Sequence, residues 1–278
     1  MFSKFQNMGK QDYTSYAVSV IGANHRDKGI ACQDAATSAT MYHKGYKFNF
    51  MAVADGHGGT SYTRSDIGSF LALQASSEAV NRFIIFVIDV FEKHPENWAE
   101  IVKSDFRDRL GKILVNNWLH MVEAHANETE KSIDEIAKLY GTTVSLAFAF
   151  NKHLFIGKIG DGSVFAVKKD KKNHVQNMFD ADETSLGLGT ASLCSKDAFR
   201  KWQTEIVPLD DIKMVFMATD GFADSLQNPA EAIMSFYSYI DRKGLKNFES
   251  IIGKQLQEIS QTGVGDDISL AIFIQETR

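Results

Sequence analysis

The sequence predicts an α+β fold in which antiparallel β-sheets are covered by α-helices. Apolar runs of strand-like composition recur along the chain, and two long stretches between them show helical periodicity. Several of the strand-like runs are joined directly by short turns, at Asn151-Lys152 and at Asp161-Gly162. A doubly wound parallel sheet needs a crossover between its strands, whereas a short turn joins antiparallel strands. The order of elements therefore favours antiparallel sheets.

Seven segments have the pattern of strands. Each is an alternating or continuous apolar run, and most have turn-forming residues at their ends. In chain order they are SYAVSVIG (15–22), YKFNFMAVA (46–54), TVSLAFAF (143–150), HLFIGKIG (153–160), SVFAVKK (163–169), KMVFMAT (213–219) and ISLAIFI (268–274).

Two helical blocks account for much of the remaining chain. The first extends from about Ser65 to Tyr140, with apolar residues at three- and four-residue intervals, and His94-Pro95-Glu96 is expected to divide it in two. The second covers about 229–261 and is expected to break at Gly244. We interpret this second block as a helical insertion before the last strand.

Composition favours one globular domain over residues 1–278. The chain is 44% hydrophobic, contains only 3 prolines and has no linker-like stretch. Its formal charge of −5 provides no overall basic character, so nucleic acid is not an expected partner.

The best apolar run, FIIFVIDVF at 83–91, is half a membrane span and contains Asp89, which favours a buried helix. With two cysteines and no signal-peptide pattern, we expect a cytoplasmic protein with no membrane partner.

Acidic residues occur at one end of four predicted strands. Asp55-Gly56, Asp161-Gly162 and Asp220-Gly221 each follow a strand, and Asp266-Asp267 precedes the last one. Asp-Gly is also a common tight-turn pair, so a turn remains an alternative for any single one of these sites. Asp55 and Asp220, however, precede helical stretches rather than partner strands, which weakens the turn as an explanation for the whole set.

Carboxylates that converge from several strand ends repel one another unless a cation lies among them. Oxygen ligands without cysteine favour Mg²⁺ or Mn²⁺ over zinc, and a glycine beside the acid allows a backbone carbonyl to approach the metal. Two such ions can activate a shared water and bind a phosphoryl group. The residues alone therefore indicate hydrolysis of a phosphate ester.

The motifs resemble those of the metal-dependent serine/threonine protein phosphatases of the type 2C family. The matching segments are CQDA (32–35), VADGHGG (53–59), GTTVSLAF (141–148), IGDGSVF (159–165), ATDGFADSL (218–226) and GDDISLAIF (265–273). They follow the family's order over most of the chain. The resemblance implies a four-layer αββα sandwich, in which two antiparallel sheets pack face to face and helices flank both sides.

The resemblance also implies the reaction and the residues that perform it. Phosphoserine and phosphothreonine in proteins would be hydrolysed through a metal-bridging hydroxide, with two or three Mg²⁺ or Mn²⁺ ions. Asp55 resembles the acid that bridges two metals, and Gly56 the residue that supplies a carbonyl ligand. The other metal ligands implied are Asp34, Asp220 and Asp266, with Asp161 at a third, weaker site. His57 resembles the general acid that protonates the leaving oxygen; a histidine that only caps the following helix is the alternative.

Several positions depart from the family pattern, among them Gly162 and Ser163, which stand where the family has a serine and an arginine after the acid. The family has an acid pair in its first motif, and here Gln33 stands at the first of the two positions. The family's phosphate-binding arginine corresponds to Gly29, so we nominate Arg26 as a displaced phosphate-binding residue, although a surface role would explain Arg26 equally well. Asp267 replaces the usual asparagine, and its added negative charge is a candidate compensation for Gln33.

Two other functions are alternatives for this sequence. Cys194 and Arg200 have the spacing of cysteine-dependent phosphatases, but the intervening segment has no glycine and contains Asp197 where an anion would bind, so we expect coincidence. A catalytically weak or inactive scaffold that binds phosphoproteins is the second alternative, motivated by Gln33 and the absent arginine. The partners expected are a phosphoprotein substrate and a kinase that acts on the same target, with the chain as a monomer.

Overall fold

Two antiparallel sheets lie at the centre of the computed structural model, which describes residues 13–170, 174–179 and 190–275. Within that part of the chain the first sheet has five strands in the order β1-β10-β9-β6-β7. These strands are β1 (Tyr13–Val20), β10 (Ile268–Gln275), β9 (Ile212–Ala218), β6 (Ser163–Lys168) and β7 (Val175–Asn177). The second sheet has the order β2-β3-β4-β5-β8 among the described residues. Its strands are β2 (Ala35–His43), β3 (Tyr46–Ala54), β4 (Val144–Phe150), β5 (His153–Ile159) and β8 (Gln203–Pro208).

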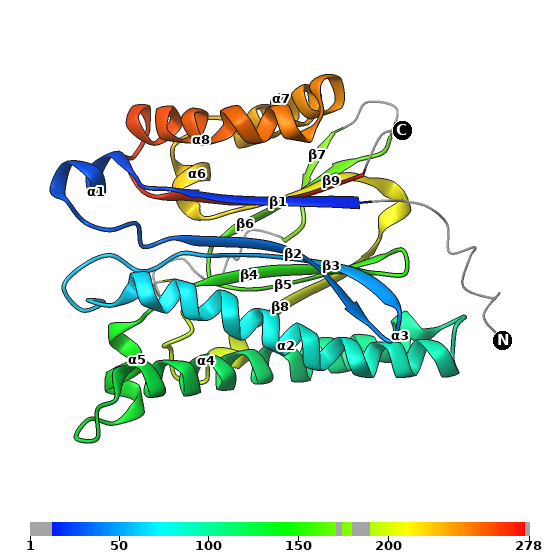
Figure 1. Cartoon of the computed structure of the whole chain (residues 1–278), viewed down its shortest axis with the longest axis horizontal. Coiled ribbons are helices and arrows are strands. Elements are labelled where there is room, and N and C mark those ends of the chain that lie inside the picture. Colours follow the sequence, from blue (N-terminus) through cyan, green and yellow to red (C-terminus); the bar gives the residue numbers. More distant parts are fainter. Residues whose placement is uncertain (1–12, 171–173, 180–189, 276–278) are drawn as a thin grey trace.

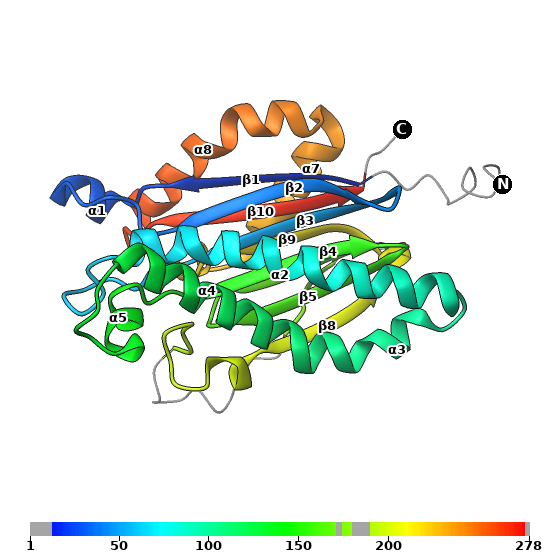
Figure 2. The ribbon, with the colours of Figure 1, turned by 60° about the horizontal axis from the view of Figure 1, so that its bottom comes forward.

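Helices cover the outer face of each sheet (Figure 1). The long helices α7 (Pro229–Lys243) and α8 (Leu245–Thr262) pack on the first sheet. The second sheet is covered by α2 (Ser65–Lys93), α3 (Trp98–Asp105), a π-helical turn η1 (Phe106–Leu110), α4 (Gly111–Ala126) and α5 (Ile133–Leu139). Figure 2 shows α2 and α4 lying across this sheet. The arrangement is the four-layer αββα sandwich that the family resemblance implies.

Three apolar layers hold the sandwich together. One lies between the second sheet and helices α2 to α5, one between the first sheet and helices α7 and α8, and one between the two sheets. In the first, the rings of Phe148 and Phe155 stack with centroids 4.6 Å apart; between the sheets, Tyr13 and Phe273 stack at 4.6 Å. Each fully buried phenylalanine stabilises the fold by about 1.5–3 kcal/mol.

The seven predicted strands are all present, and three further strands were not predicted. Strand β2 consists mainly of alanine, serine and threonine, so it lacks the apolar run by which strands are recognised. Strands β7 and β8 are edge strands with polar, exposed positions. The hydrophobic pattern therefore identifies strands that carry an apolar run, the edge strand β1 included, and misses these three more polar edge strands.

The predicted turns behave in two different ways. Asn151-Lys152 is a hairpin turn with φ of 40° and 66°, and it joins the paired strands β4 and β5. Asp161-Gly162 was expected to be a turn of the same kind, but it connects β5 of the second sheet to β6 of the first, and these two strands do not pair. This turn therefore carries Asp161 across the end of the sandwich.

The helical blocks break where the sequence predicts and at one further point. His94-Pro95-Glu96 lies between α2 and α3, and Gly244, with φ of 82°, separates α7 from α8. The additional break follows Asn127, whose left-handed φ of 49° ends α4. Ser132 then starts α5 with a capping box that includes Glu135. The helices interpreted as an insertion are α7 and α8, which form one of the four layers.

Helix α2 is the most apolar helix in the described part of the chain. By length and composition it is able to cross a membrane, but 61% of its most apolar window is buried inside the structure. Val80, Phe83, Ile84 and Val87 are all within the apolar layer that packs on the second sheet. Burial of this face explains the apolar run that includes Asp89, whose carboxylate is partly exposed and pairs with Lys44.

Candidate metal centre

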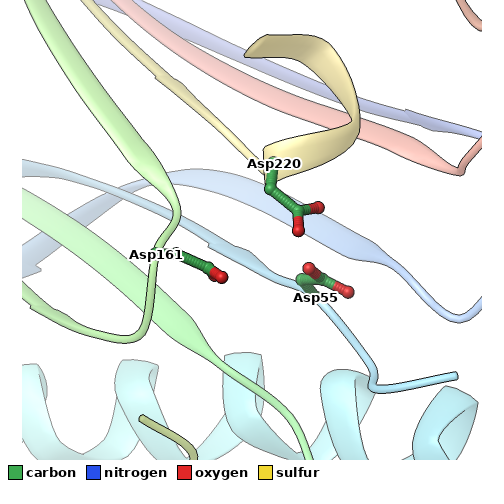
Figure 3. Close-up of side chains that lie close together, drawn as sticks. All are labelled: Asp55, Asp161 and Asp220. Atoms are coloured by element: carbon green, nitrogen blue, oxygen red, sulfur yellow. The ribbon is translucent and has the colours of Figure 1, made fainter. Parts of the chain in front are cut away.

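Three carboxyl groups from distant parts of the chain meet at one end of the sandwich. Asp55 follows β3, Asp161 lies between β5 and β6, and Asp220 begins the short helix α6 (Asp220–Asp224) after β9. One oxygen atom from each lies within 4.8 Å of the others. Figure 3 shows the three side chains pointing toward one another from separate elements. This is the convergence that the sequence predicts from acids at strand ends.

The segment after α5 fixes the backbone of Asp55. The amide of Thr143 donates to the carbonyl oxygen of Asp55 at 2.8 Å, and the Thr142 hydroxyl donates to the same oxygen at 2.8 Å. The Asp55 amide donates in turn to the Thr143 hydroxyl at 3.2 Å. Three hydrogen bonds leave the Asp55 side chain free to face the other acids. The GTT part of the 141–148 motif is the sequence signal for these two threonines, whose role was not predicted.

Gly56 occupies a position that only glycine fits. A Cβ atom there would lie 2.5 Å from the carbonyl oxygen of Gln33 and 2.6 Å from that of Ser65. Its amide donates to the Gln33 carbonyl oxygen at 3.1 Å. Three backbone segments approach closely at Gly56, which explains why a glycine follows Asp55 here. A tight turn is therefore not needed to explain the Asp55-Gly56 pair.

Asp55 and Asp220 hold their protons more strongly than an ordinary aspartic acid does, because the pKa of each is raised. Burial, followed by the charges of Asp34 and Asp220, raises the pKa of Asp55 to about 11. Burial also raises the pKa of Asp220, with added repulsion from Asp161 and Asp266. Neutral protonated acids would be poor ligands and poor catalysts, so this group is built for a compensating positive charge.

Asp34 and Asp266 lie next to the three-carboxylate group but outside the 4.8 Å set. Asp34 is buried, and its Oδ2 accepts a hydrogen bond from the Thr219 hydroxyl at 2.6 Å. Burial raises the pKa of Asp34, and the charges of Asp267, Asp220 and Asp266 add to this shift. Asp266 is exposed, with its Oδ1 accepting from the amide of Asp267 at 2.8 Å.

His57 lies at the edge of the same group of acids. Its amide donates to the Gly141 carbonyl oxygen at 3.0 Å, and its ring contacts Tyr62 edge-on with centroids 5.0 Å apart. Burial lowers the pKa of His57, while the nearby charge of Asp161 acts in the opposite direction. An imidazolium with a lowered pKa is a stronger proton donor.

The structure places Arg26, the nominated phosphate-binding residue, at the surface. Arg26 lies on the exposed surface of α1 (Ala23–Lys28), and no ion pair to it is present among the described residues. Helix α1 ends at Gly29, whose φ of 67° suits glycine. Gln33, at the altered acid position, has a buried Oε1 without a hydrogen-bond partner in the described structure. A Cβ atom on Gly58 would be 3.7 Å from this oxygen, so the side-chain amide of Gln33 faces the DGHGG segment.

Two further residues contact the site and were not predicted to do so. The Thr190 hydroxyl donates to Oδ2 of Asp161 at 2.6 Å. Asp267, considered in the sequence only as an added charge, is 2% exposed and accepts hydrogen bonds from the loop that contains Gln33. A single sequence has no pattern that links either residue to its partner, since the contacts cross 29 and 234 positions.

The donor set fits a hard divalent cation. All candidate ligands are oxygen atoms, and the raised pKa values show that the acids lack compensating charge. The orphaned Gln33 Oε1 adds one more buried oxygen that faces this region. Mg²⁺ and Mn²⁺ prefer such ligands. Asp55, Asp161 and Asp220 would hold the ions, and Asp34, Gly56 and Asp266 are the further candidates.

The cysteine-phosphatase alternative finds no support in the geometry. Cys194 is half-buried, and its sulfur lies 3.2 Å from the Ser192 hydroxyl. Arg200 is exposed; its guanidinium lies 5.9 Å from the Phe199 ring centroid and 3.9 Å from Asp197. Arg200 thus contacts Phe199 and Asp197 on the surface.

Comparisons with known proteins agree with this geometry. The family model described as protein phosphatase 2C matches residues 21–258. A comparison with curated proteins finds no significant match. Among solved structures, the S. agalactiae serine/threonine phosphatase is similar with a TM-score of 0.61 and 15% identity, over 95% of this chain and 100% of that one. The catalytic domain of the Mycobacterium tuberculosis phosphatase PstP, in complex with 2 manganese ions, has a TM-score of 0.55 and 12% identity, over 94% and 97% of the chains. Because the family match covers most of its length, the chain belongs to the protein phosphatase 2C family.

Proposed function

We propose that this chain hydrolyses phosphoserine and phosphothreonine in proteins, with Mg²⁺ or Mn²⁺ as cofactor. The observation that carries the proposal is the convergence of Asp55, Asp161 and Asp220 within 4.8 Å at the end of a phosphatase-family sandwich. Two ions, or three if Asp161 holds another, are the cofactors we propose. When bound, they supply Lewis-acid activation of a water and positive charge for the phosphate.

The protein residues contribute orientation and proton transfer. Asp55, with its backbone held by Thr142 and Thr143, would provide a fixed carboxylate for both ions, and Gly56 a carbonyl ligand. His57 would donate a proton to the serine or threonine oxygen as it leaves, because that alkoxide is a poor leaving group without one. Arg26 is the residue we propose for phosphate binding, since Gly29 provides no side chain at the family's arginine position.

A catalytically weak or inactive scaffold for phosphoproteins is the second candidate function. It is favoured by one observation, the neutral Gln33 in place of the first acid together with Gly29 in place of the arginine. The raised pKa of Asp55 speaks against it, because a scaffold without metal would gain nothing from crowding buried carboxyls.

Hydrolysis of p-nitrophenyl phosphate with Mn²⁺ distinguishes the two functions. We expect turnover by the wild type and a loss of about 10²-fold or more in Asp55→Asn. Asp108→Asn, which changes an exposed acid paired with Arg107, is the matched control and should retain full activity. A folded wild-type chain with no more turnover than Asp55→Asn would support the scaffold instead.

The remaining expectations about this chain are proposals as well. We propose a phosphoprotein as substrate, a kinase of the same target as the opposing enzyme, a monomeric state and a cytoplasmic location. Neither nucleic acid nor a membrane is part of the proposed function.

A further inference from the structure

Asp267 is a buried carboxylate with three donors around it. Its Oδ1 accepts from the Gly22 amide at 2.6 Å, and its Oδ2 accepts from the Gln33 amide at 2.6 Å. The Nδ1 atom of His25 lies 2.9 Å from the same Oδ2. The three donors come from both ends of the segment that contains α1 and from its middle. The side chain of Asp267, directly before β10, therefore anchors the segment from Gly22 to Gln33.

The geometry accounts for aspartate at a position where the resembling family has asparagine. A carboxylate only accepts hydrogen bonds, whereas an amide presents one accepting oxygen and one donating NH₂ group. The two backbone amides, of Gly22 and Gln33, always donate and contact different oxygens. Either orientation of an asparagine would therefore place its NH₂ group against a backbone N–H. The carboxylate is the form that these donors require.

Hydrogen bonds connect Gln33 to the candidate metal centre as well as to Asp267. The backbone of Gln33 is held at both of its polar groups: its amide donates to Asp267, and its carbonyl oxygen accepts from the Gly56 amide at 3.1 Å. Asp34, the next residue, is bound to Thr219. The position of Gly56, a candidate carbonyl ligand, thus depends on a hydrogen-bonded path that begins at Asp267.

The backbone around Asp267 is itself fixed by close packing. A Cβ atom on Gly22 would lie 2.3 Å from the carbonyl carbon of Asp266, and one on Gly221 would lie 2.1 Å from the carbonyl oxygen of Asp267. Two other backbone segments, each with a glycine at the contact, therefore pack directly against this backbone. The carboxylate is therefore a rigid anchor for the more exposed segment of α1.

We propose that Asp267, oriented by His25, is a positioning residue that sets Gln33 and, through it, Gly56 for metal binding. This inference rests on the proposed metal-dependent function. The negative charge of Asp267 is used to anchor the α1 segment, rather than to compensate for Gln33 at a metal. His25 and Asp267 do not themselves contact the ions in this scheme.

Titration of the full chain with Mn²⁺ alone tests the proposal. We expect Asp267→Asn to raise the dissociation constant for Mn²⁺ about tenfold or more, as loss of an outer-shell partner does. Hydrogen exchange in chelator should become faster in the 51–59 segment, which carries the Gly56 amide. His25→Ala keeps the carboxylate and should shift both readouts in the same direction to a smaller extent. The exposed Asp108→Asn change is the matched control and should shift neither.

A purely structural role would give a different result. The proposal is overturned if Asp267→Asn lowers the melting temperature but leaves the Mn²⁺ dissociation constant within about twofold and exchange of segment 51–59 unchanged. Should Asp267→Asn fail to fold, His25→Ala decides on the same two readouts. A wild-type chain that binds Mn²⁺ without hydrolysing phosphate would refute the proposed function while leaving this inference intact.

Discussion

Asp55 is buried in a way that favours its protonated form, whereas a metal ligand must be an ionised carboxylate. Burial and the neighbouring acids raise its pKa to about 11 in the metal-free protein, so the folded chain keeps this carboxyl protonated at neutral pH. The unfolded chain releases the proton near the ordinary value of 3.8. The difference is a cost to metal-free stability that a bound cation would relieve.

Asp55→Asn should therefore stabilise the metal-free protein while removing activity. An asparagine carries no charge at any pH, so at about pH 8 the variant avoids the ionisation that favours unfolding of the wild type, a gain of up to about 6 kcal/mol for a pKa raised from 3.8 to about 11. Thermal unfolding in chelator measures this effect. A metal-free variant that unfolds below the wild type at this pH would show that the carboxyl is a structural hydrogen-bond partner instead.

His57→Gln should affect substrates according to their leaving group. A phosphoserine or phosphothreonine peptide needs a proton on the departing oxygen, so its kcat should fall by about 10²–10⁴-fold. p-Nitrophenolate leaves without a proton, so hydrolysis of p-nitrophenyl phosphate should change little. Equal losses for both substrates would assign His57 to the structure of the site rather than to acid catalysis.

Sequence alone located the acids of the candidate centre but not the groups that place them. Asp55, Asp161 and Asp220 could be predicted because each ends an apolar run, and strand ends gather at the ends of a sandwich. Asp267 differs, because its role lies in hydrogen bonds to Gly22 and Gln33, more than 230 positions away. No local pattern reports such a contact.

At the scale of elements, strands with an apolar sequence and strands of small or polar residues differ in how far their own sequence predicts them. Strand β3 was predicted with its observed boundaries because both of its faces are largely buried and most of its residues are apolar, Lys47 and Asn49 excepted. Strand β2, with the sequence AATSATMYH, pairs with β3 over its full length, yet its small residues are mostly half-exposed. Its strand state depends on its partner rather than on its own composition.

Two glycines in helices should respond oppositely to alanine. In α2, a Cβ atom at Gly68 would be 1.9 Å from the carbonyl oxygen of Tyr140, so Gly68→Ala forces helix and loop apart and should cost about 1–3 kcal/mol. In α8, Gly253 has open space around it, so Gly253→Ala should stabilise by about 0.5–1 kcal/mol. Denaturant unfolding compares the two. Equal shifts of the same sign would mean that α2 does not pack as described.

At the scale of the whole molecule, the fold class could be predicted but the strand order could not. β1 pairs with β10 along its entire length, in a register that joins Tyr13 to Gln275. The turn at Asp161 leaves one sheet for the other, although its sequence is that of a hairpin. Pairings of this kind are set by packing between distant segments, which a single sequence does not display.

The metal-free molecule should lose stability as the pH rises. Burial raises the pKa of Asp34, Asp55 and Asp220 in the folded state, so the stabilisation from their protonated forms is complete below the ordinary pKa of 3.8. It declines as the pH rises toward the folded values, about 11 for Asp55, at up to about 1.4 kcal/mol per pH unit for each carboxyl.

Melting curves between about pH 5 and pH 9, with chelator or with saturating Mn²⁺, measure this dependence. The curves in chelator should fall with pH, and those with Mn²⁺ should fall much less, because the metal replaces the protons. Identical slopes under both conditions would mean that the acids do not bind the cation.

The metal dependence of the proposed phosphatase activity is measured by the release of phosphate from a phosphothreonine peptide as Mn²⁺ is added to chelator-treated protein. We expect no release in chelator, saturable release as Mn²⁺ is restored, and none at any Mn²⁺ concentration in Asp55→Asn. Release that persists in chelator, or that is equal in Asp55→Asn, would contradict the proposed metal dependence.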